Sequence, residues 1–169
     1  MTTVETPVAA QLSRQQLALI FQYTIEAYKT FEKLAENLPN PMTATMFKQF
    51  AIDERGNRDL IELKATALGE QVGATVGGDL GFQDIIEGEL SWRESAEFLI
   101  GRERTMQRKL REFIKAVGPM DQNLLLYLES TKKSHAVELE RELELLKLDS
   151  DWWKREDAEW RIVHGAPKV

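Results

Sequence analysis

The chain has 169 residues, of which 43% are hydrophobic and 30% charged, and its net charge is −6. This composition is that of one globular domain with a single core, and it excludes a disordered chain. The absence of cysteine excludes disulfides, iron–sulfur clusters and thiol nucleophiles, and the acidic charge without a basic stripe argues against nucleic-acid binding.

The first predicted element is a flexible N-terminal segment, residues 1–12, which is polar and poorly patterned. It has no basic start, and the apolar runs of the chain are only a few residues long, so the sequence predicts no secretory signal and no membrane span. We therefore expect a cytoplasmic protein. A first helix follows from Ser13, a typical N-cap residue, to Asn37, where Pro39 and Pro41 end the pattern.

The second predicted helix begins near residues 41–43 and ends at Gly69. The connection that follows, roughly residues 70–91, contains the run GATVGGDLG, which is too rich in glycine for a helix. We therefore expect a long crossover at this point. The run lacks the Gly-Lys-Ser/Thr ending of a phosphate-binding loop.

The third predicted helix begins after Ser91, where SWRE has the form of a capping box, and ends at Gly118 and Pro119. The fourth runs from about Met120 to Lys147, and its ELERELELLK run is predicted to be a solvent-exposed face. Two short links and one long link join the four helices. This order predicts an all-α, antiparallel four-helix bundle over residues 13–149.

An apolar stripe runs along each predicted helix, and polar residues interrupt all four stripes at about the same depth. The interrupting residues are Thr24, Glu54, Asn57, Glu103, Lys132 and His135. The first three and the last three have nearly equal spacings, as in a duplicated helical hairpin. Buried polar groups cost several kcal/mol when they lack partners, so we expect these residues to meet one another, water or a metal.

The pattern resembles that of ferritin-like, rubrerythrin-type proteins. In ferritin-like di-iron proteins two helices each carry a Glu and the other two each carry a Glu-x-x-His motif. The segments AYKTFEKLAENL, FKQFAIDERGNRDLIELKATALG and YLESTKKSHAVELERELELL carry the resemblance, which covers roughly residues 15–147. The rubredoxin module of full rubrerythrins is missing, because it needs four cysteines.

The resemblance implies a two-metal site that has lost half of its ligands. Thr24 stands where the family has the first glutamate, Asn57 where it has a histidine, and Lys132 where it has a bridging glutamate. The three family ligands that remain are Glu54, Glu103 and His135.

Three interpretations of this remnant follow. In the first, Lys132 lies between Glu54 and Glu103 and replaces the metals, and the protein has a structural, binding or regulatory role without a cofactor. In the second, Glu54, Glu103 and His135 bind one iron, manganese or zinc ion. The protein would then be a metal-dependent oxidoreductase that acts on reduced oxygen species.

In the third interpretation the vacated space binds a small ligand through polar side chains. The residues expected to contact such a ligand are Thr24, Asn57, Tyr28 and Tyr127.

The tail, residues 150–169, is rich in tryptophan and is predicted to form a short helix. Trp152, Trp153 and Trp160 either fold back to close the bundle or contact a protein partner, since tryptophan is enriched at interfaces. We expect a homodimer, without nucleic-acid or membrane partners. His164 has no predicted role.

Overall fold

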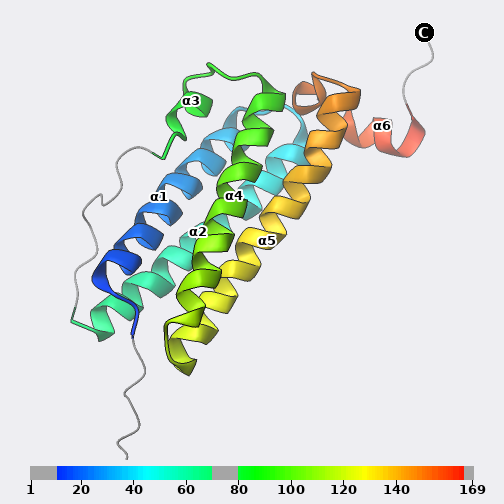
Figure 1. Cartoon of the computed structure of the whole chain (residues 1–169). Helices are drawn as coiled ribbons and strands as arrows, with labels where there is room; N and C mark the ends of the chain where they lie inside the picture. Colours follow the sequence, from blue (N-terminus) through cyan, green and yellow to red (C-terminus); the bar gives the residue numbers. More distant parts are fainter. Residues whose placement is uncertain (1–10, 70–79, 166–169) are drawn as a thin grey trace, which may run out of the picture.

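The computed structural model describes residues 11–69 and 80–165, and every regular element within these ranges is helical. Four long helices lie side by side as a bundle (Figure 1). They are α1 (Arg14–Asn37), α2 (Pro41–Ala67), α4 (Trp92–Lys115) and α5 (Pro119–Leu148). Three short elements are α3 (Gln83–Ile86), the 3₁₀ helix η1 (Trp152–Lys154) and α6 (Ala158–His164). The all-α prediction is confirmed.

The predicted glycine-rich run and the flexible N-terminus lie largely outside the described residues. Among the helices of the two described ranges, none is long and apolar enough to cross a membrane.

Capping residues fix the starts of the long helices. The Ser13 hydroxyl accepts from the amide of Gln16, whose side chain accepts from the Ser13 amide in return, and Ser91 and Glu94 form the same reciprocal pair. The Asn40 side chain caps α2. The predicted starts at Ser13 and Ser91 are therefore confirmed.

The connection before α4 contains one helical turn, α3, that the sequence analysis did not predict. Ile85 of this turn and Phe82, which precedes it, are buried against the bundle. Gly81 has a φ of +85°, and a Cβ atom there would lie 3.0 Å from the Phe98 ring. Glycine is thus needed where the chain turns into α3.

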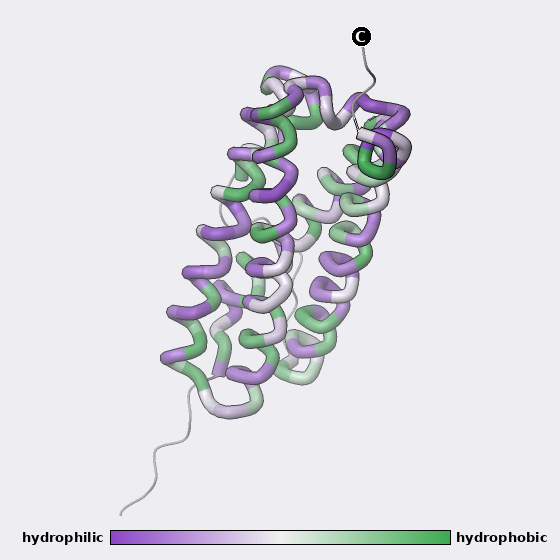
Figure 2. The backbone as a smooth tube through the Cα atoms, turned by 90° about the vertical axis from the view of Figure 1, so that its right-hand side faces the viewer, coloured by the Kyte–Doolittle hydropathy of each residue, from purple (hydrophilic) through white to green (hydrophobic). Residues whose placement is uncertain are grey.

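The bundle is built from two helical hairpins. Helix α1 packs along α2, and α4 packs along α5, with fewer backbone contacts between the two hairpins. Apolar and hydrophilic residues alternate along each long helix (Figure 2), so one side of each helix supplies the core. The ion pair between Lys64 of α2 and Asp121 of α5, with a nitrogen–oxygen distance of 2.5 Å, joins the hairpins at one end.

The C-terminal tail closes the opposite end of the bundle. Trp153 is fully buried, and its ring packs edge-on against Phe47 and beside Trp92. The side chain of Asn40 donates to the carbonyl oxygen of Trp152 at 2.8 Å, which ties η1 to the start of α2. The tail therefore folds back onto the bundle.

This cap corrects one prediction about the last helix. Glu142 lies in the run predicted to be a solvent-exposed face, yet it is buried beneath η1. Its carboxylate accepts from the Trp152 indole N–H and the Thr43 hydroxyl, each at 2.9 Å. Of the three tail tryptophans, Trp152 and Trp153 are thus inside the molecule, whereas Trp160 is 48% exposed.

Candidate functional site

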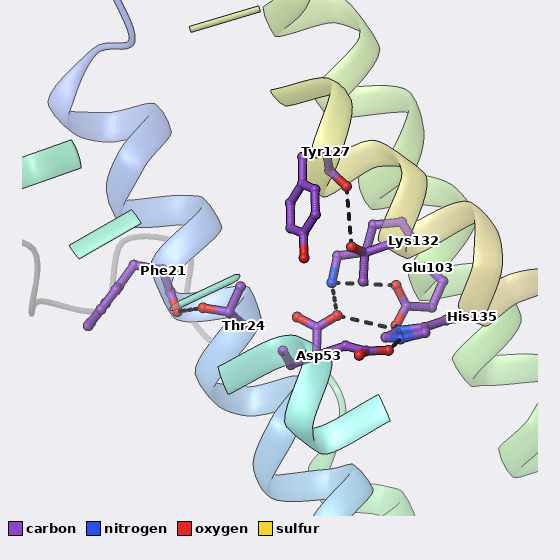
Figure 3. A network of polar contacts seen from close by, with 9 residues as sticks. Phe21, Thr24, Asp53, Glu103, Tyr127, Lys132 and His135 are labelled. Atoms are coloured by element: carbon purple, nitrogen blue, oxygen red, sulfur yellow. Dashed lines mark hydrogen bonds and ion pairs between the residues drawn. The ribbon is translucent and has the colours of Figure 1, made fainter. Parts of the chain in front are cut away.

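The polar residues that interrupt the four apolar stripes are all buried inside the bundle. Glu103, Lys132 and His135 point toward one another, whereas Thr24 bonds to Phe21 of its own helix (Figure 3). Each of the interrupting residues is at most 1% exposed, and α1, α2, α4 and α5 all contribute. The set comprises Thr24, Glu54, Asn57, Glu103, Lys132 and His135. The prediction that these residues are buried in the core is therefore confirmed, and contacts between helices join four of them: Glu54, Glu103, Lys132 and His135.

Lys132 supplies a positive charge within this cluster. Its ammonium contacts Glu54 Oε1 directly and lies 3.7 Å from Glu103 Oε2, and its side chain is only 2% exposed. The same ammonium is 4.7 Å from the centre of the Tyr23 ring, a cation–π contact. One lysine of α5 thus bridges carboxylates that belong to α2 and α4.

His135 lies beside the same two carboxylates. Its Nδ1 lies 3.4 Å from Glu103 Oε1 and 3.5 Å from Glu54 Oε1, while its Nε2 lies 2.9 Å from Asp53 Oδ2. The ring stacks on Phe50 at a centroid distance of 4.0 Å. Packing and the Asp53 contact therefore fix the orientation of the imidazole.

The electrostatic environment shifts the pKa values of these groups. Burial lowers the pKa of His135, but the hydrogen bonds to Asp53 and Glu103 and the charges of Glu103 and Glu54 outweigh it and raise that pKa to about 9. Burial raises the pKa of Glu54, although the charge of Lys132 opposes the shift. At neutral pH the histidine is thus a second cation of the cluster.

Two members of the site were missed in the sequence. Asp53 lies at the edge of the α2 stripe, where its carboxylate reaches His135 of α5. Tyr23 is adjacent to Thr24 in α1 and is 4% exposed. Burial, with the negative charges of Glu103 and Glu54, raises the pKa of Tyr23. Each of the two residues directly precedes a predicted site residue, Glu54 or Thr24, and this adjacency is the signal by which the sequence could have indicated them.

Several buried polar atoms of the cluster make no hydrogen bond to any described residue. They are Glu54 Oε2, Glu103 Oε2, both polar atoms of the Asn57 side chain and the Tyr23 hydroxyl oxygen. An unsatisfied buried polar group costs about 1–3 kcal/mol. The centre of the bundle therefore has more hydrogen-bonding capacity than its own side chains use.

The two tyrosines expected to contact a small ligand lie elsewhere. Tyr28 is partly buried on the outer side of the first hairpin, where the guanidinium groups of Arg55 and Arg58 lie over its ring. Tyr127 is 59% exposed. The prediction that they supply polar contacts in the core is wrong, because Tyr127 is largely exposed and Tyr28 is a partly exposed residue whose ring contacts two arginines.

The residues present do not fit a pair of metal ions. The hydroxyl of Thr24 donates to the carbonyl oxygen of Phe21 at 2.8 Å, and the ammonium of Lys132 has no lone pair to offer a metal. One ion fits better, since Glu54, Glu103 and His135 offer three ligand atoms within 4.8 Å of one another.

Comparisons with known proteins add nothing to this geometry, because no family model, no curated protein and no solved structure matches the chain. Membership of the rubrerythrin-type family therefore stays a prediction from the sequence.

Proposed function

We propose that this chain is a ferritin-like, rubrerythrin-type bundle with a non-enzymatic structural, binding or regulatory role, in which Lys132 takes the place of the metals. The observation that carries the proposal is the position of the Lys132 ammonium, in contact with Glu54 and 3.7 Å from Glu103 at the centre of the four helices. In such proteins this is the position from which a metal ion joins the helices.

Electrostatics supports this role for the lysine. Two carboxylates buried within a few ångströms of one another repel, and each loses its hydration. Lys132 compensates for this with a cation that is covalently part of α5, so the compensation does not depend on the concentration of any metal. A divalent ion would have to enter against the charge of this ammonium.

The experiment that tests the proposal is metal stoichiometry. The purified full-length chain is loaded anaerobically with iron(II), manganese(II) or zinc(II), desalted, and assayed by elemental analysis. We expect almost no metal in the wild type. We expect Lys132→Glu to bind metal, because it removes the internal cation and adds a ligand of the kind the family uses. About one metal per wild-type chain, lost in Glu103→Gln, would contradict the proposal.

A second candidate is a mononuclear metal site, with iron, manganese or zinc and activity towards reduced oxygen species. The orientation of His135 favours it, because a carboxylate that accepts from the outer nitrogen of a metal-binding histidine is a common supporting contact. Two ligands at a tetrahedral angle and about 2.1 Å from one ion lie about 3.4 Å apart. The distances of Nδ1 to Glu103 and Glu54, 3.4 and 3.5 Å, are close to this value.

The same loading experiment separates the two candidates. Metal retained by the wild type and lost in both Glu103→Gln and His135→Gln supports the mononuclear site. In that case Asp53→Asn is expected to weaken binding about 10–100-fold, as the loss of a supporting contact does in other metal sites. Binding that does not change in Asp53→Asn would count against this role for the histidine.

A further inference from the structure

The contact between Lys132 and Glu54 brings together two groups that can react with one another. The side-chain nitrogen of Lys132 touches a carboxylate oxygen of Glu54, and their side chains are 2% and 0% exposed. The second oxygen of that carboxylate, Oε2, makes no hydrogen bond to any described residue. An amine and a carboxyl group are thus held in contact, away from bulk water, with one carboxyl oxygen uncommitted.

A third group is placed to move protons between them. Glu103 Oε2 lies 3.7 Å from the Lys132 nitrogen and makes no hydrogen bond within the described ranges. A carboxylate beside an amine and a carboxyl group is suited to take a proton from one and give it to the other. The opposite oxygen of Glu103 faces His135 at 3.4 Å, which holds the carboxylate in position.

We propose that Lys132 and Glu54 condense into an isopeptide bond, with Glu103 as the proton carrier. The Lys132 Nζ forms a bond to the Glu54 Cδ, and the bond from Cδ to Oε2 breaks. The ammonium carries three protons: one stays on the amide nitrogen, and Glu103 passes the other two to Oε2, which leaves as water. The reaction consumes no oxidant, metal or nucleotide.

Burial and proximity both favour the product. The amide replaces a buried ammonium and a buried carboxylate with one neutral group, so the desolvation cost of two charges is removed. Two reacting groups held in contact by a folded chain react as if at very high concentration. After the reaction Glu103 still faces His135, whose Nδ1 lies 3.4 Å from Glu103 Oε1.

The bond would join the two hairpins covalently. Lys132 and Glu54 are 78 positions apart in the sequence and lie on α5 and α2. A cross-link between such distant positions restricts the unfolded chain and stabilises the fold. The inference rests on the proposed role of Lys132 as the group that joins the helices: the ion pair is the state before the reaction, and the amide is the state after it.

The deciding measurement is the intact mass of the denatured, full-length wild type. We expect a mass lower than that of the sequence by one water, about 18 Da. Proteolysis followed by tandem mass spectrometry should then yield one branched peptide that joins Lys132 to Glu54. A wild-type mass equal to that of the sequence after prolonged incubation in the folded state would overturn the inference, and so would a branch at Glu103.

Two variants test the chemistry separately from folding. Glu103→Gln keeps the size of the side chain but cannot carry the proton, so it should retain the mass of its sequence. Glu54→Gln keeps a reactive acyl group and should lose one ammonia instead of one water. If Glu103→Gln cross-links as fast as the wild type, the role given to Glu103 is wrong. If the wild type is not cross-linked and takes up no metal, the amide is refuted but the proposed function is not. If the wild type takes up metal, the proposed function is refuted.

Discussion

Glu54 and Glu142 are both buried glutamates, and burial raises the pKa of each, yet their surroundings differ. Glu142, beneath the C-terminal cap, receives one hydrogen bond on each carboxylate oxygen, from Thr43 and from Trp152. Glu54, in the middle of the bundle, has a charged neighbour in Lys132 and an oxygen without a hydrogen bond to any described residue.

The difference separates a structural contact from a reactive one. Neutral donors fix Glu142 and leave it no further role than to hold the cap on the bundle. The middle of the bundle instead concentrates charges of both signs with unsatisfied oxygens, an arrangement typical of sites that bind or react. The predictions below test whether the two carboxyl groups differ in this way.

The largest effect is expected for Lys132→Met. The substitution keeps the volume of the side chain but leaves Glu54 and Glu103 buried without their shared cation. We expect the free energy of unfolding to fall by about 4 kcal/mol, as when one partner of a buried ion pair is removed. Urea denaturation followed by circular dichroism measures this change.

Lys147→Met is the matched control, because Lys147 pairs with Glu144 on the surface, where the two side chains are 40% and 70% exposed. Its effect should stay within about 0.5 kcal/mol. An unchanged melting temperature in Lys132→Met would show that the central lysine does not stabilise the carboxylates.

Trp153→Ala is expected to have the next largest effect. The ring is fully buried between Phe47 and Trp92, so its removal leaves a cavity under the cap and should cost about 3–4 kcal/mol. Trp160→Ala, at a residue that is 48% exposed, should cost less than about 1 kcal/mol. Equal losses in the two variants would mean that the cap is not held by Trp153.

A third prediction concerns pH. The folded chain raises the pKa of His135 from 6.5 to about 9, so the folded state binds this proton more tightly than the unfolded state. The resulting stabilisation, roughly 3 kcal/mol, is complete below pH ~6.5 and is lost as the pH rises towards about 9.

The measurement is the stability difference between wild type and His135→Gln, each with a chelator present, at intervals from pH 6 to pH 9.5. The difference should shrink across that window. A constant difference would show that folding does not change the pKa of this histidine, and a difference that grows with pH would show that folding lowers it.

The sequence alone predicted the parts of this structure that depend on local pattern. Ser13 and Ser91 begin helices because their side chains accept from the backbone three residues later, a contact confined to one turn. The shared burial of the polar residues followed from helical periodicity and link length, since short links bring antiparallel helices into register.

What the sequence did not predict depends on how separate helices are rotated about their axes. Asp53 sits at the edge of a stripe, and a small rotation of α2 would point its carboxylate into solvent instead of at His135. The pattern of the last helix alone predicts that Glu142 is exposed. It is buried because Trp152, ten positions later, folds over it. Such contacts depend on how the helices and the tail pack against one another and not on local periodicity.

The smallest effect is expected for Glu142→Gln, and it separates the two buried carboxyl groups most directly. The amide oxygen can still accept from the Trp152 indole, and the amide nitrogen can donate to the Thr43 hydroxyl, whose role then reverses. Loss of the carboxylate charge offsets part of any weaker hydrogen bond, so the free energy of unfolding should change by less than about 1 kcal/mol.

Glu54→Leu is the comparison, because it leaves the buried Lys132 with only the more distant Glu103 as a counter-charge and with no acyl group to react with. It should destabilise the chain by more than Glu142→Gln does, by about 3 kcal/mol in the same urea titration. If both substitutions cost the same, the charge of Glu54 is no more important than that of Glu142. The middle of the bundle would then be a second structural contact, and neither the ion pair nor the amide would be needed to explain it.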